Sequence, residues 1–146
     1  MKIEFTIPGE PKGKGRPRFT KSGHAYTPKS TAEYETAVKA AYYEAVGANC
    51  RFEAGIPLGM HITAYCGIPK SAGKKKHADM MSQLILPTKK PDADNIVKVI
   101  ADALNRVAYY DDAQIVHLSY GKVYGETPHV NVVIENLMNQ ERKYVE

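Results

Sequence analysis

KPDADNIVKVIADALNRV, at residues 90–107, carries a strong helical pattern. Apolar residues recur in it at intervals of three and four positions, so that they would form one face toward a core: Ile96, Ile100, Ala103, Leu104 and Val107. Asp94, Lys98, Asp102 and Asn105 would then share another face. We therefore predict a helix that begins near Asp94, buries its apolar side and turns a charged side outward.

Strand-like alternation occurs on both sides of this helix. Residues 2–7, 59–68, 114–124 and 129–136 alternate apolar with polar residues, and the third run would place Val116, Leu118 and Tyr120 on one side. A second helix should run from Ser30 to about Val46, with Ser30 and Glu33 as a capping box and Gly47 just after its end.

The remaining segments complete the expected architecture. Residues 19–26 suggest a small hairpin or a wide loop. Residues 70–90 show no clear period before residues 80–86, and their opening at 71–76 looks like an exposed loop. No repeat or linker divides the chain, so we expect a single domain at 1–136 and a tail at 137–146 that forms a short helix or a frayed end. The predicted fold is α/β of the α+β type, with a small mixed sheet packed by two main helices.

The bulk composition excludes several classes of protein. At 146 residues and 43% hydrophobic content the chain is typical of one globular domain. It has no apolar run near the roughly 20 residues of a membrane span, and its start does not resemble a signal peptide. Cys50 and Cys66 lack the spacing of a metal or redox pair, which favours free thiols and a cytoplasmic protein. We expect no membrane partner and no small-molecule cofactor.

The charges are unevenly distributed along the chain. The net charge is +4, yet basic residues dominate the segments 10–29 and 69–90, while acids gather between Asp92 and Asp112. Small residues between the bases would let the backbone approach phosphates closely. We predict that two clusters bind DNA: Lys12, Lys14, Arg16 and Arg18 in the first, and Lys74, Lys75 and Lys76 in the second. The alternative is a pair of solvated loops.

The acids are candidate metal ligands. Asp92 and Asp94 are two residues apart at a bend into the helix, where both carboxylates could converge on one ion, and Asp112 or Asp111 could join them from the turn after the helix. Mg²⁺ takes hard oxygen ligands and typically one or two carboxylates. The alternative is that these aspartates only cap a helix and form a turn.

Two further residues of the helix extend this candidate site. Lys98 lies one turn after Asp94, where it either forms a surface ion pair or orients an attacking water and neutralises charge on a phosphate. Asp102, one turn further on, either holds Lys98 in place without binding the metal itself or is solvated.

Other chemistries find little support in the sequence. The histidines show no metal-ligand spacing, so a zinc site is not expected. No serine or cysteine has the surroundings of a nucleophile. The aromatic residues Phe19, Tyr26, Tyr109 and Tyr110 could stack on an opened base, but core packing is the better prediction for most of them.

These motifs together resemble the RusA family of phage- and prophage-associated Holliday-junction resolvases. The similarity lies in the run from Lys90 to Asn95, followed by Lys98, residues 102–105 and residues 110–115, and in Ile7-Pro8-Gly9 with the basic run at 14–18. It extends over about residues 3–135. One departure is the stretch between Asp102 and the paired acids, which lacks an expected glycine and is about a residue shorter, so Asp111 remains an alternative to Asp112.

The resemblance implies an activity and a set of residues. It implies a Mg²⁺-dependent homodimer, with Mn²⁺ able to substitute, that resolves four-way junctions by paired symmetric nicks in DNA recombination and repair. Asp92, Asp94 and Asp112 match the metal-site acids of the family, and Lys98 matches its essential lysine, so these four are the expected catalytic residues. Two rival hypotheses stay open: a non-catalytic DNA-binding module, and a metal-dependent nuclease that acts on flaps or forks.

Overall fold

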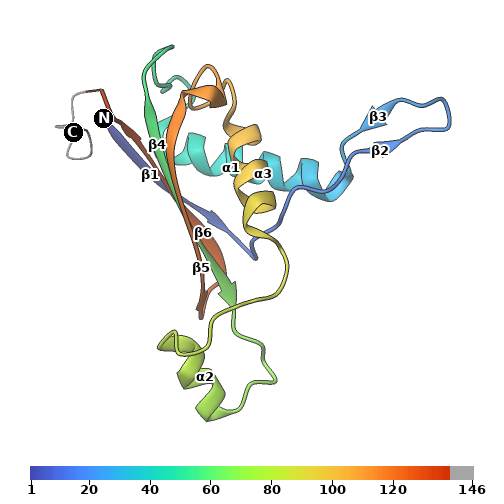
Figure 1. The fold of residues 1–146 in the computed structure, drawn as a ribbon, viewed down its shortest axis with the longest axis vertical. Coiled ribbons are helices and arrows are strands. Elements are labelled where there is room, and N and C mark those ends of the chain that lie inside the picture. Colours follow the sequence, from blue (N-terminus) through green and yellow to red (C-terminus); the bar gives the residue numbers. More distant parts are fainter. Residues whose placement is uncertain (139–146) are drawn as a thin grey trace.

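A four-stranded mixed sheet forms the centre of the molecule (Figure 1). The computed structural model describes residues 1–138. The strands are β1 (Lys2–Pro8), β4 (Leu58–Gly67), β5 (Ile115–Gly125) and β6 (His129–Asn136), in the order β1-β6-β4-β5. β6 is antiparallel to both β1 and β4, whereas β4 and β5 are parallel. The four strands predicted from sequence are therefore present, and their sheet is mixed as expected.

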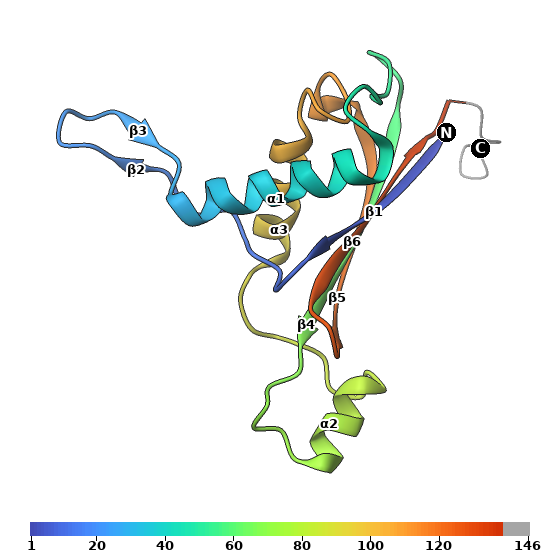
Figure 2. The same cartoon turned by 180° about the vertical axis from the view of Figure 1, so that it is seen from behind.

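Two helices, α1 (Lys29–Val46) and α3 (Ala93–Leu104), lie on one side of this sheet (Figures 1 and 2). The alternation in β1 buries every second residue, and the core between the sheet and the helices is built from side chains with almost no exposed surface, among them Tyr42, Leu58, Ile96, Ile100 and Ile134. This arrangement confirms the predicted α+β fold and the predicted core face of α3.

The connection from β4 to β5 positions the candidate site. Because these strands are parallel, the chain must cross over between them, and the crossover contains α2 (Lys74–Met81), α3 and the single 3-10 turn η1 (Asp112–Gln114). α3 ends at Leu104, and Arg106 has a φ of 66°. Val107 thus follows the helix, although the sequence pattern places it inside, and the paired acids lie in the short return to β5.

The capping box predicted at Ser30 is wrong. α1 begins at Lys29 with Pro28 as its N-cap, and no side chain caps it. Since Ser30 is already inside the first turn, its hydroxyl is not in the position from which an N-cap residue accepts the orphan N–H groups. The other end agrees with the sequence, because Val46 is the last helical residue and Gly47 follows with a φ of 85°.

The expected loop at 71–76 is also partly wrong, since α2 begins at Lys74 and runs to Met81. Met80 packs against Cys66 and Tyr124 in a small second core, and the side-chain amide of Gln83 donates to the Tyr124 carbonyl at 2.9 Å and accepts from the Tyr124 N–H at 3.2 Å. These contacts with the ends of β4 and β5 stabilise a helix whose own sequence shows no clear period.

The expected hairpin is present at residues 18–26. β2 (Arg18–Phe19) pairs with β3 (Ala25–Tyr26), and the pair projects from the body of the protein beyond the start of α1 (Figures 1 and 2).

Three smaller findings concern the rest of the chain. Cys50 and Cys66 are free thiols, as predicted. Within residues 1–138 no helix is long and apolar enough to span a bilayer. The tail predicted as a short helix or frayed end lies, from residue 139 on, outside the described residues.

Candidate active site

The start of α3 presents two carboxylates to solvent. Asp92 is the N-cap of α3 with an extended backbone, and its side chain makes no capping hydrogen bond. Asp94 lies in the first turn. The core residues Ile96 and Ile100 fix the rotation of the helix, so that both aspartates are exposed. The Asp92 carboxylate is 3.4 Å from the Lys90 ammonium, and its charge is favoured by the positive end of the helix dipole.

Lys98 and Asp102 continue the charged face of α3. They follow Asp94 at intervals of four residues, so the face rises about 12 Å from Asp94 to Asp102. Lys98 is exposed. The ion pairs found among residues 1–138 include none from Lys98 to either aspartate, and the Lys98 ammonium is therefore accessible to a bound phosphate.

The partner of Asp102 is Lys14 rather than Lys98. The Lys14 ammonium donates to the Asp102 carboxylate at 2.7 Å, and the exposed fractions of the two side chains are 23% and 32%. The Lys14 N–H also donates to the Asn95 carbonyl at 3.0 Å. In the structure the Lys14 ammonium is bound to Asp102, and its contact with DNA phosphates stays a prediction. No local pattern could reveal this pair, because 88 residues separate its members.

Gly13 and Gly15 allow the segment around Lys14 to pack closely against the starts of α3 and α1. A Cβ on Gly13 would lie 3.0 Å from the Cβ atoms of both Asn95 and Pro91. The Gly15 N–H donates to the buried Thr31 hydroxyl at 2.9 Å, and a Cβ there would lie 2.7 Å from that oxygen. In the structure these glycines let the chain pack closely on the protein itself, and a close approach to phosphates stays a prediction.

In the turn before β5, the neighbouring residues Asp111 and Asp112 make different hydrogen bonds. The Asp111 carboxylate caps η1 by accepting from the Ala113 N–H at 2.9 Å, while the Gln114 side chain accepts from the Asp111 N–H at 3.1 Å. The Asp112 N–H donates to the Asn105 side chain at 3.1 Å. Partial burial raises the pKa of Asp112, and so do Asp111 and the negative charge of Asp102. Asp112 is therefore an electrostatic neighbour of Asp102.

Tyr109 packs beneath these acids. Its hydroxyl donates to the Ala101 carbonyl at 2.7 Å, and burial, followed by the charges of Asp112 and Asp102, raises its pKa. Tyr109 thus belongs to the core, as expected. Core packing was the wrong prediction for Phe19, Tyr26 and Tyr110, which are exposed, because the hairpin and the turn stand away from the sheet and helices.

The acids form a row along α3 rather than one compact cluster. Asp92 and Asp94 lie at its start, and Asp102 and Asp112 lie toward its end. Among residues 1–138 no group of three or more His, Cys, Asp or Glu side chains is arranged to hold a metal ion. The exposed pair Asp92 and Asp94 nevertheless suits a hard cation that takes one or two carboxylates and completes its shell with water and phosphate oxygens. Metal ligation by Asp92, Asp94 and Asp112 stays a prediction.

Exposed basic side chains gather in two parts of the chain, the segment that leads into the hairpin and the first turn of α2. Lys12, Arg16 and Arg18 are exposed on the way into the hairpin, and Lys74, Lys75 and Lys76 are exposed in the first turn of α2. Only Lys75 of that triplet has an ion pair in the described part of the chain, with Asp79 at 3.6 Å. In both views the start of α3 lies between α2 and the hairpin (Figures 1 and 2).

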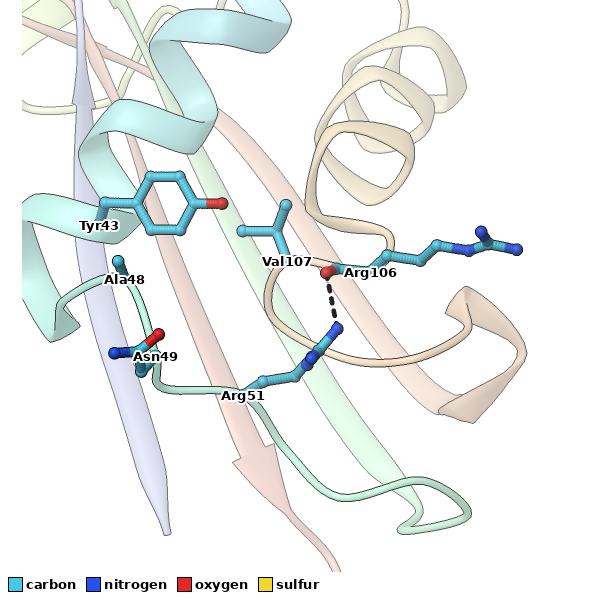
Figure 3. A pocket seen from close by; sticks show the side chains of 6 residues that line it. All are labelled: Tyr43, Ala48, Asn49, Arg51, Arg106 and Val107. Atoms are coloured by element: carbon cyan, nitrogen blue, oxygen red, sulfur yellow. Dashed lines mark hydrogen bonds between the residues drawn. The ribbon is translucent and has the colours of Figure 1, made fainter.

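A separate hollow lies between the end of α1 and the turn after α3 (Figure 3). Its lining residues are Tyr43, Ala48, Asn49, Arg51, Arg106 and Val107. Arg51 donates to the Arg106 carbonyl at 3.0 Å and stacks 4.3 Å above the ring centre of Tyr110. None of the predicted site residues lines this hollow, which makes the face of α3 the better candidate for chemistry.

Fold and site together define a small basic α+β protein with exposed carboxylates at the start of α3, between the hairpin and α2 (Figure 1). A family model described as "Endodeoxyribonuclease RusA" matches residues 8–135, and the chain therefore belongs to the RusA family. Membership implies the nuclease activity of a Holliday-junction resolvase, which acts on branched DNA and generally depends on a divalent metal. The chain is also 38% identical over 142 residues to the uncharacterized protein YqaN of Bacillus subtilis (strain 168), covering 92% of this chain and 96% of that protein.

Proposed function

We propose that this protein is a Mg²⁺-dependent homodimeric endonuclease that resolves four-way DNA junctions by paired symmetric nicks. The observation that carries the proposal is the exposed carboxylate pair Asp92 and Asp94 at the start of α3, between two cationic projections. A set of acids that only capped the helix would use the Asp92 side chain for a capping hydrogen bond, and it makes none.

Each side chain of the site has a role that follows from its position. Asp92 and Asp94 hold the ion, which when bound supplies charge neutralisation at a phosphate and a more acidic water. Lys98, exposed one turn further along, stabilises the charge that builds up on the scissile phosphate. Lys14 neutralises Asp102 and thereby limits the repulsion that Asp102 exerts on Asp112.

The two basic surfaces hold the DNA arms through phosphates. Exposed lysines and arginines in the segment that leads into the hairpin and in α2 bind the DNA backbone without reading its base sequence. Each neutralised phosphate releases counterions, so binding should weaken steeply as salt increases. The exposed Phe19 and Tyr26 of the hairpin add faces on which an unpaired base can stack.

A second copy of the chain fits both the substrate and the sheet. A symmetric junction cut on two opposed strands calls for a two-fold dimer with one site per subunit. β5 is an edge strand, and Val116 and Leu118 on it are 64% and 46% exposed. We propose that this edge is covered by the partner. We also propose that the protein is cytoplasmic, because the free thiols Cys50 and Cys66 stay reduced there.

Replacing one carboxylate tests the role of the start of α3. Asp94→Asn keeps the shape of the side chain but removes its charge, so junction binding should be retained while cleavage in Mg²⁺ falls by about 100-fold or more. The matched control is Glu44→Gln, which removes an exposed carboxylate of α1 and should leave cleavage unchanged. Gel-shift binding without Mg²⁺ and single-turnover cleavage with Mg²⁺ measure the two effects. Near wild-type cleavage by Asp94→Asn would contradict the assignment.

A further inference from the structure

The segment that leads into Asp92 crosses from α2 to α3 without regular secondary structure. Pro87 is buried, whereas Thr88, Lys89 and Lys90 are exposed. The backbone after Asp92 is held by α3, because the Asp92 carbonyl accepts from the Ile96 N–H at 3.1 Å. The backbone before it must be held as well, since a displacement of about 1 Å is enough to spoil a metal site. The contacts that hold residues 87–91 therefore matter for the proposed chemistry.

Those contacts come largely from one lysine of β5. The Lys122 ammonium donates to the Lys89 carbonyl at 2.6 Å and to the Pro91 carbonyl at 3.1 Å. In the part of the chain that the structure describes, the backbone of residues 87–91 has no other hydrogen bond. Both bonds carry the charge of the ammonium, and such bonds are about twice as strong as neutral ones.

Lys122 is itself held firmly. It pairs with Ala64 in the parallel ladder between β4 and β5, and its side chain is half-buried. The segment has a second close neighbour in Gly13, where a Cβ would lie 3.0 Å from the Cβ of Pro91. Pro91 is thus held from the sheet by Lys122 and from the N-terminal loop by Gly13.

We propose that Lys122 is a positioning residue that ties the segment before Asp92 to the sheet and thereby fixes the Asp92 carboxylate for metal binding. This inference rests on the proposed function only in its second part, the link to metal. Lys122 was predicted neither as a DNA contact nor as a site residue, because nothing in its strand distinguishes it from a solvated lysine.

The test compares Lys122→Met, which keeps the length and apolar stem of the side chain, with two other variants. Lys122→Arg retains a charged donor and should restore function in part. Lys89→Met removes a neighbouring exposed charge but keeps the carbonyl that Lys122 binds, so it controls for the loss of charge alone. If Lys122→Met does not fold well, Lys122→Gln serves in its place.

Two measurements separate the tether, by which Lys122 holds residues 87–91 to the sheet, from its effect on metal binding at Asp92. In the metal-free protein, NMR order parameters of the amides at Thr88, Lys89, Lys90 and Asp92 should fall from about 0.85 toward about 0.6 in Lys122→Met, and not in Lys89→Met. In cleavage of a four-way junction, the Mg²⁺ concentration for half-maximal rate should rise by about tenfold, with the maximal rate much less affected.

Each outcome has a definite meaning. Unchanged order parameters in Lys122→Met would overturn the tether, and lowered order parameters with an unchanged Mg²⁺ requirement would overturn its link to Asp92. If the order parameters fall but the wild-type protein shows no metal-dependent cleavage of branched DNA, the tether stands and the proposed function fails.

Discussion

Asp112 has a raised pKa because its carboxylate is partly buried and lies near the negative charges of Asp111 and Asp102. The native state therefore binds a proton at Asp112 more tightly than the unfolded state does. As the pH rises from the ordinary value of 3.8 through the raised pKa, the native protein loses stability relative to the unfolded chain. Where Asp112 is ionised in the native state, its charge is a local source of instability, which a bound cation would relieve.

Asp112→Asn should consequently stabilise the metal-free protein at pH 7, and the gain should vanish near pH 3, where wild-type Asp112 is protonated in both states. Urea unfolding in EDTA at the two pH values measures this. Asp111→Ala is the contrasting variant, because it removes the cap of η1 and should lower the free energy of unfolding by about 1 kcal/mol. A lower urea midpoint for Asp112→Asn than for the wild type at pH 7 would show that the charge of Asp112 does not destabilise the native protein.

Single residues were predictable where neighbours in sequence decide their environment. The bend before α3 and the apolar stripe at Ile96 and Ile100 follow from local spacing, and they are sufficient to expose Asp94. The partners of Asp102 and Pro91 were not predictable, because Lys14 and Lys122 come from distant segments. Long-range pairs of this kind leave no periodic signal.

At the scale of elements, β5 is only partly protected as an edge strand. Its end is covered by the Gln83 side chain at Tyr124. Residues 115–121 contain no charged residue and no proline, the features that usually prevent an exposed edge from pairing with another chain. Val116 and Leu118 increase the apolar surface of the same stretch. We therefore expect the open part of β5 to pack against a second copy.

Leu118→Lys should convert a dimer into a monomer at micromolar concentration, since it places a charge in the proposed interface. Light scattering measures the mass, and the melting temperature reports whether the fold is retained. Thr6→Lys is the matched control, because it introduces the same charge at an exposed position of β1, the opposite edge of the sheet. A wild-type protein that is monomeric and fully active would contradict the dimer.

The elements also show where local pattern is insufficient. The strands and the two main helices have a clear period, and their bounds were predicted to within a few residues. α2 has none, and it exists because Met80 and Gln83 find partners on β4 and β5. The start of α1 was misplaced because Ser30 and Glu33 imitate a capping box, although Pro28 ends the extended segment and the helix begins at once.

Taken as a whole, the molecule places the start of α3, which carries Asp92 and Asp94, between the hairpin and α2 with its Lys-rich first turn (Figure 1). Both projections carry exposed cations, so a duplex arm on each would bring a phosphate toward the start of α3. A branched substrate offers two arms at an angle, whereas a linear duplex offers one axis. We therefore expect junctions to be preferred over linear DNA as the substrate.

Cleavage of matched substrates tests this account most directly. A four-way junction, a flap, a fork and a linear duplex of the same sequence are compared at one salt concentration while Mg²⁺ is titrated from zero. We predict Mg²⁺-dependent cleavage that is fastest on the four-way junction and yields symmetric nicks on two opposed strands. Flap or fork cleavage at an equal or higher rate, or no cleavage of any substrate at saturating Mg²⁺, would contradict the proposed function.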